Sequence, residues 1–173
     1  MTIPPEIPIQ KYIKVSSDAD LAGFWVDALG WIACYFAQLE GLSYAIVEQF
    51  GSASDRKRVL KMKYQDRTDV SRRLICAHLV VRGEAQLSDE WNAFLIEARA
   101  TAPLRNKILH NPLGINMAAA NSIEDPDQGI VLMQEPGRPT IKLGAVQSFA
   151  QGLMVLNKRM LDLMHRTGLK GAI

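Results

Sequence analysis

One repeating pattern dominates the early part of this sequence. From Ser17 to Phe50, apolar side chains recur mostly at three- and four-residue steps, the spacing of one face of an α-helix. Ser17 or Asp18 can cap its start, and Gly51 can end it. About 33 residues at ~1.5 Å each give a helix roughly 50 Å long. A small domain cannot cover that length alone, so the pattern predicts a bend near Gly41 or a partner chain. The stripe comprises Leu21, Trp25, Ala28, Leu29, Ile32, Phe36, Leu39, Ser43, Ile46, Val47 and Phe50.

Composition indicates one globular domain. The chain has 173 residues, of which 48% are hydrophobic and 22% charged. Residues 1–16 begin with "MTIPPEIPIQ", which predicts an irregular N-terminal arm and does not resemble a secretory signal. Residues 17–173 are predicted to form a single helical domain. The apolar stretch "WIACYFA" falls far short of the ~20 residues of a membrane span. Cys34 and Cys76 read as buried free thiols, so we expect a cytoplasmic protein without membrane contact.

Hydrophobic periodicity, together with capping residues, prolines and glycines, predicts three more helices. "TDVSRRLICAHLVVRG" predicts one, with an inner face of Val70, Leu74, Ala77 and Val81. "SDEWNAFLIEARATAPLRNKILH" predicts another, capped by Ser88, kinked before Pro103, and ended at about His110 by Pro112. "LGAVQSFAQGLMVLNKRMLDLMHRTG" predicts the last helix, which Gly168 ends.

The segment between these last two helices has a different character. "GIVLMQE", the turn "PGRP" and "TIKL" predict a small β-hairpin within an insert spanning about residues 115–143. The expected fold class is therefore all-α: a helical bundle with a small β-hairpin insert before its last helix.

Basic residues concentrate in one segment although the whole chain carries a net charge of only +2. Between Asp55 and Arg73 there are eight basic and three acidic residues. Such a segment can attract a polyanion such as RNA, although a solvated linker and helix face explain it equally well. The candidate RNA-binding residues are Arg56, Lys57, Arg58, Lys61 and Lys63.

Metal and cofactor sites have no motif here. The sequence contains three histidines, no Cys-x-x-Cys and no Glu-x-x-His on a predicted helix. It also lacks a glycine-rich phosphate loop. We therefore expect neither a metal nor a cofactor.

The stretch "APLRNKILHNPLG" carries the most distinctive polar cluster. Arg105, Asn106 and His110 fall within six residues, and Asn-Pro follows at once. Arginine followed after four to six residues by histidine also occurs in "RRLICAH", ending at His78, and in "RMLDLMH", ending at His165. Only Arg105 is followed by an uncharged polar residue, and only His110 stands where a proline ends its helix. The cluster therefore stands apart from the other two.

This cluster resembles the signature of HEPN domains, the helical nucleotide-binding family of higher eukaryotes and prokaryotes. The resemblance extends over most of the chain: a long first helix, a basic connector, two helices with the motif closing the second, and a final helix. It implies a homodimer in which two motifs meet in one cleft. Arg105 and His110 are about 140° apart on a helix, which fits a site completed by a second copy.

RNA entering such a cleft meets residues suited to cleavage without a metal. One His110 would take the proton of a ribose 2′-hydroxyl and a second would protonate the leaving 5′-oxygen. Arg105 would hold the phosphate oxygens, and Asn106 would orient His110 or the phosphate. The products would be a 2′,3′-cyclic phosphate and a 5′-hydroxyl. An endoribonuclease of this type would be a toxin or defence effector with an antitoxin-like protein partner.

Two other functions remain open on the sequence. The chain could be a non-catalytic helical dimer that binds a nucleotide, an RNA or a protein partner. Alternatively, the basic segment from Arg56 to Arg73 is the working surface, and "RNKILH" is scaffold.

Overall fold

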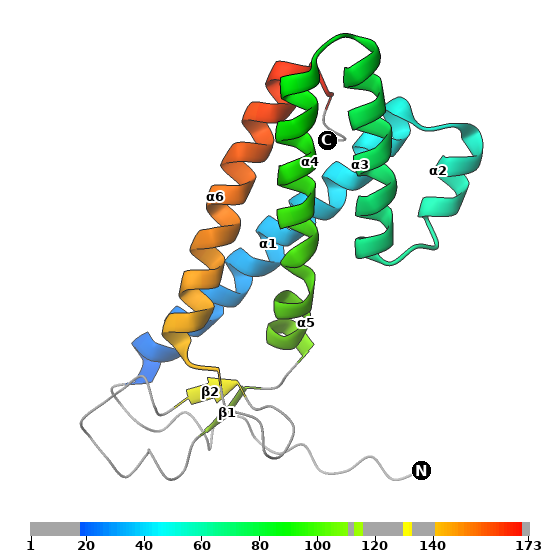
Figure 1. Ribbon diagram of the computed structural model, residues 1–173. Helices are drawn as coiled ribbons and strands as arrows, with labels where there is room; N and C mark the ends of the chain where they lie inside the picture. Colours follow the sequence, from blue (N-terminus) through cyan, green and yellow to red (C-terminus); the bar gives the residue numbers. More distant parts are fainter. Residues whose placement is uncertain (1–17, 111–112, 116–129, 133–140, 171–173) are drawn as a thin grey trace, which may run out of the picture.

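The structure is a computed structural model that describes residues 18–110, 113–115, 130–132 and 141–170. The chain is mostly helical in these ranges, as the all-α prediction requires (Figure 1). The predicted arm, residues 1–16, lies outside the described residues. The elements are α1 (Asp18–Phe50), α2 (Ala53–Val59), α3 (Tyr64–Val81), α4 (Ala85–Ala100), α5 (Ala102–His110), β1 (Leu113–Ile115), β2 (Ile130–Leu132) and α6 (Leu143–Thr167).

Helix α1 confirms the long helix and organises the bundle. It runs from Asp18 to Phe50 without interruption, including at Gly41, and crosses behind α4 in Figure 1. Helices α3, α5 and α6 all pack against it. From Trp25 onward the predicted stripe is buried or half-buried, so helices of the same chain cover it. Its fully buried large side chains are Trp25, Ile32, Phe36, Leu39 and Ile46.

The inner face of α3 differs from the predicted one. Val81 is 88% exposed and Ala77 is also exposed, whereas Ser71 and Thr68 are buried. The Thr68 hydroxyl donates to the Tyr64 carbonyl at 2.8 Å, and the Ser71 hydroxyl lies 2.9 Å from two backbone carbonyls. Hydroxyls satisfied in this way can be buried at little cost. The prediction was therefore right for Val70 and Leu74, which are buried and half-buried, and wrong for Ala77 and Val81, because the buried face also includes these satisfied hydroxyl residues.

Arg67 lies in the core although the sequence places it in the basic segment. Only 4% of it is exposed. Its Nε donates to the Ser43 hydroxyl and its Nη1 to the Tyr44 hydroxyl, both at 2.7 Å. Its guanidinium carbon is 4.0 Å from the centroid of the Tyr44 ring, and its Nη2 is 3.5 Å from the Glu40 carboxylate. Arg67 thus ties the start of α3 to α1.

Three predictions about the following helices have different outcomes. The chain breaks beside Pro103, as expected, since α4 ends at Ala100 and α5 begins at Ala102. Helix α5 also ends at His110, as predicted. Ser88, however, does not cap α4, which begins one turn earlier. Ser88 is buried and donates to the Cys76 carbonyl at 3.4 Å.

The β insert is described only in part. Strands β1 and β2 pair antiparallel, with Leu113 opposite Leu132. Leu143, which the sequence patterns placed both at the end of the second predicted strand and at the start of the last helix, begins α6. The turn of the predicted hairpin, residues 136–139, lies outside the described residues, so the hairpin stays a prediction.

Two further features concern the ends and surface of the helices. Gly168 ends α6 in the left-handed conformation, with φ of 68°, as the sequence predicts. Cys34 is exposed rather than buried, and Cys76 is half-buried. Among the described helices, none is both long and apolar enough to span a membrane.

The burial of α1 predicts which of its apolar residues stabilise the bundle. Ile32→Ala should lower the free energy of unfolding by about 2–5 kcal/mol, because Ile32 is completely buried. Val26→Ala is the matched control on the same helix, and Val26 is 66% exposed. We expect that change to stay within about 0.5 kcal/mol. Urea unfolding of both variants measures the difference, and equal losses would contradict this packing.

Candidate functional site

Arg105 is held in place by its neighbours on two helices. Its guanidinium carbon lies 4.6 Å from the centroid of the Phe36 ring on α1, a cation–π distance. Its Nη1 donates to the Asn106 side-chain oxygen at 3.0 Å. Its Nε is buried, and no described residue accepts its hydrogen. The side chain is therefore oriented, yet one of its donors has no acceptor.

A hollow of about 240 Å³ opens beside this arginine. It lies where α1, the start of α3 and the first turns of α5 meet. Its lining mixes two aromatic rings with charged and amide side chains, so polar groups converge on a partly apolar floor. The lining residues are Phe36, Glu40, Lys63, Tyr64, Gln65, Ala102, Arg105 and Asn106.

Cations outnumber anions around this hollow. Lys63 and Arg105 line it, and no described carboxylate lies within 4 Å of the cationic group of either residue. Among the described lining residues, Glu40 is the one carboxylate, and its Oε1 lies 3.5 Å from Arg67 Nη2. Because Arg67 compensates Glu40, the remaining charge of the hollow is positive and favours an anion.

Tyr64 forms part of the wall and stays neutral. Its ring centroid is 4.7 Å from that of Phe36, and its hydroxyl donates to the Ala98 carbonyl at 3.3 Å. Burial raises the pKa of Tyr64 to about 12. Tyr64 therefore contributes shape and a neutral surface to the hollow, with no negative charge at physiological pH.

His110 lies away from the hollow. It is exposed at the end of α5 and is absent from the lining. It lies five positions after Arg105, which is roughly 7.5 Å along a helix axis. The structure thus brings Arg105 and Asn106 together but not His110. Asn106 holds Arg105, whereas the sequence reasoning expected it to orient His110 or a phosphate.

The other two arginine–histidine matches use their arginines elsewhere. Arg72 donates to the Asn92 side chain at 2.8 Å, and Arg159 lies 2.9 Å from Glu97. Arg73, which also precedes His78, is exposed. The bare spacing therefore gives three matches, but only Arg105 combines an aromatic support with a hollow beside it.

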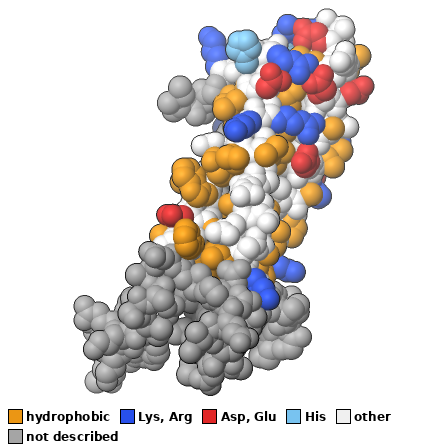
Figure 2. All heavy atoms as spheres, turned by 90° about the vertical axis from the view of Figure 1, so that its left-hand side faces the viewer, with side chains coloured by type: hydrophobic (Ala, Val, Ile, Leu, Met, Phe, Trp, Pro, Cys, Tyr) orange, Lys and Arg blue, Asp and Glu red, His pale blue; other side chains and the backbone are white. Residues whose placement is uncertain are grey.

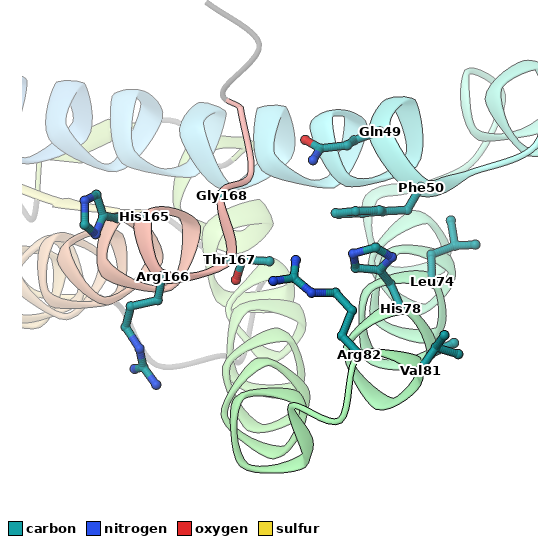
Figure 3. Close-up of a pocket in the computed structure, with 11 residues that line it drawn as sticks. Gln49, Phe50, Leu74, His78, Val81, Arg82, His165, Arg166, Thr167 and Gly168 are labelled. Carbon is teal, nitrogen blue, oxygen red and sulfur yellow. The ribbon is translucent and has the colours of Figure 1, made fainter.

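A second, larger hollow lies at the end of the bundle where α1, α3 and α6 finish (Figure 3). It measures about 1050 Å³ and is widely open to solvent. The His78 ring packs against Phe50 in a tilted arrangement with centroids 4.4 Å apart, while His165 and Arg166 point away from the middle of the view. The sequence reasoning missed this hollow, because residues from three distant segments line it.

The arginines around this larger hollow are neutralised by acidic neighbours. Arg82 lies 2.6 Å from Glu84, and Arg166 lies 2.6 Å from Glu90. Hydrogen bonding to Arg166 lowers the pKa of Glu90 below its ordinary value. The larger hollow therefore offers less free positive charge than the smaller one.

The predicted RNA-binding residues are dispersed over α2 and the loop after it. All five are exposed, as a contact surface requires. Arg56 lies 3.5 Å from Glu48, and Arg58 lies 3.3 Å from Asp55, so part of their charge is compensated. Lys63 alone lines the hollow beside Arg105.

Neither a candidate metal site nor a similar protein helps to assign a function to the hollow beside Arg105. Within the described ranges, no group of three or more His, Cys, Asp or Glu side chains could hold a metal ion. No family model, curated protein or solved structure matches this chain. The HEPN resemblance therefore rests on the residues and stays a prediction.

The raised pKa of Tyr64 predicts a late ionisation and a loss of stability at high pH. The unfolded chain releases this proton near 10 and the folded chain near 12. The free energy of unfolding should therefore fall as the pH rises from about 10 towards 12, because the unfolded state is deprotonated first. The ultraviolet absorbance of tyrosinate follows the ionisation. Tyr64→Phe should remove the late phase, and an unchanged titration curve would contradict the assignment.

Proposed function

We propose that this chain is a HEPN-like, metal-independent endoribonuclease that acts as a homodimer. The observation that carries the proposal is that the Arg105 side chain is held in place and still has an unused donor. Phe36 and Asn106 orient its guanidinium at a cationic hollow, with Nε still lacking an acceptor. A preoriented arginine of this kind suits the charge that develops on a phosphate during cleavage.

The chemistry needs two proton-transfer groups on either side of that phosphate. One His110 would accept the proton of the ribose 2′-hydroxyl while the 2′-oxygen bonds to phosphorus. The bond from phosphorus to the 5′-oxygen would break, and a second His110 would give that oxygen its proton. The products are a 2′,3′-cyclic phosphate and a 5′-hydroxyl. His110 is exposed at the end of α5, which supports its access to RNA.

The distance between His110 and the hollow favours a site shared by two copies. One chain supplies only one His110, and that residue lies beyond the hollow of its own Arg105. A second copy would bring the other histidine from the opposite side. Among the described residues, Phe24 and Trp31 on α1 are 53% and 55% exposed, and Leu161 on α6 is 58% exposed. Large apolar side chains at such exposure supply area for self-association.

The side of the molecule where α6 lies also shows apolar surface. In Figure 2, hydrophobic side chains extend along the middle of this face, and charged ones gather towards its upper end. An apolar groove of about 510 Å³ runs between α1 and α6, lined by Ala37, Gln38, Gly41, Leu42, Ala45, Met160, Leu161 and Met164. These features support the proposed homodimer. An antitoxin-like partner and a cytoplasmic location belong to the same proposal.

One observation favours a second function without catalysis. The hollow contains Arg105 and Lys63 but not His110, and anion binding needs only the first two. On this alternative the chain is a helical dimer that binds a nucleotide or an RNA and leaves it intact. His110 then becomes a solvated residue at a helix end.

Cleavage of a mixed RNA pool in excess EDTA separates these functions. The wild-type chain should produce cyclic-phosphate ends, and His110→Ala should reduce the rate by about 10²–10⁴-fold, the usual contribution of a general acid or base. His165→Ala is the matched control, because His165 is also exposed and also follows an arginine. It should leave the rate unchanged. A folded wild-type dimer that cleaves nothing would exclude the nuclease and leave the binding function.

A further inference from the structure

We propose that the hollow beside Arg105 is a subsite for one phosphate of the RNA backbone, with Lys63 as its second cation. This inference rests on the proposed function for the identity of the ligand. It adds Lys63, which lies 42 positions before Arg105 in the sequence and reaches the hollow from the start of α3.

The unused edge of the Arg105 guanidinium points to the kind of ligand. Its recorded hydrogen bond uses Nη1, which leaves Nε and Nη2 on another edge. These two nitrogens form the parallel pair of donors that binds two oxygens of one phosphate or carboxylate. Buried donors in folded proteins nearly always have an acceptor, and Nε has none within the described chain. Arg105 also lines the hollow, so a phosphate held there is the acceptor that the proposed subsite would offer to this edge.

The size of the hollow limits what can enter. At about 240 Å³ it is smaller than the roughly 300–1,000 Å³ of pockets that enclose whole small molecules. It therefore suits one phosphate with part of its sugar, while the adjoining nucleotides stay outside. That arrangement is expected of a site that holds a long strand at one point of its backbone.

The charges around the hollow favour a phosphate over a neutral group. Lys63 adds a cation from α3 to the one that Arg105 supplies from α5, and the anion of Glu40 is balanced by Arg67. A backbone phosphate carries a full negative charge, so two cations from separate elements bind it without a further counter-ion. No hydrogen bond from a side chain caps the start of α3 at Lys63, and Asp66 in the same turn offsets the positive potential of its backbone N–H groups, so the two side-chain cations carry the argument.

The test measures binding without cleavage. The probe is a short fluorescein-labelled 2′-O-methyl uridine oligomer, which keeps the phosphates and lacks the 2′-hydroxyl that cleavage requires. Fluorescence anisotropy should show that Lys63→Ala weakens binding about 5–10-fold, the loss expected for one phosphate contact, and lowers the slope of log affinity against log salt by about 0.7. Thermal melting checks that the variant is folded. This binding assay does not depend on cleavage. A chain that binds the oligomer but cleaves no RNA would contradict the nuclease proposal and leave the phosphate subsite intact.

Lys61→Ala is the matched control, because Lys61 is exposed on the same connector but does not line the hollow. It should change the affinity by less than about twofold, since it makes no contact with the bound phosphate. Equal losses for Lys61→Ala and Lys63→Ala would overturn the subsite and assign binding to the basic segment as a whole.

A double variant tests whether Lys63 and Arg105 act on the same phosphate. The combined loss for Lys63→Ala with Arg105→Ala should be smaller than the product of the two single losses, because removing either contact weakens the other. Strictly multiplicative losses would place the residues at separate phosphates and contradict the proposal. Uridine 5′-monophosphate serves as competitor. If it displaces the oligomer at a concentration similar to the dissociation constant of the oligomer, the phosphate subsite stands but its ligand is a free nucleotide.

Discussion

Burial of one stripe along α1 is the constraint on which the rest of this structure depends. Helix α1 is too long for any one neighbour, and α3, α5 and α6 of the same chain each cover part of it. Phe36 belongs to that stripe and is 1% exposed. Arg105 from α5 and Tyr64 from α3 both rest against the Phe36 ring. The packing that buries α1 therefore also brings together the two elements that form the candidate site.

Polar contacts in the core explain why the hollow beside Arg105, where α1, α3 and α5 meet, keeps a net positive charge. Arg67 is held by hydroxyls of α1 and lies beside Glu40, so the carboxylate in the hollow is compensated from behind. Removing Arg67 would leave Glu40 to neutralise one of the two cations that face the hollow. Arg67, which the sequence places in the basic segment, would thus contribute to the proposed subsite indirectly, by compensating Glu40.

Hydrophobic periodicity and the positions of proline and glycine predicted where helices form more reliably than they predicted which residues contact one another. The stripe of α1, the break beside Pro103 and the end of α6 at Gly168 all follow from local spacing and backbone preference. The inner face of α3 followed only in part, since Val70 and Leu74 face inward but so does Ser71, whose hydroxyl bonds the Ser43 carbonyl of α1 in the folded chain. The cluster at Arg105 could be found from its sequence context, because Asn106 and Pro112 distinguish it from two other matches to the same spacing. Its hollow could not, because Lys63 and Glu40 approach it through tertiary packing.

The most direct test of this account is an NMR titration of the Arg105 side chain. The Nε–H resonance, assigned by its loss in Arg105→Lys, reports the one donor of the site that lacks an acceptor. Addition of the uncleavable uridine oligomer should shift this resonance in a saturable way, with the same midpoint as the anisotropy measurement. If the oligomer binds while the Arg105 Nε–H resonance stays unchanged, the hollow does not receive the phosphate and the account is wrong.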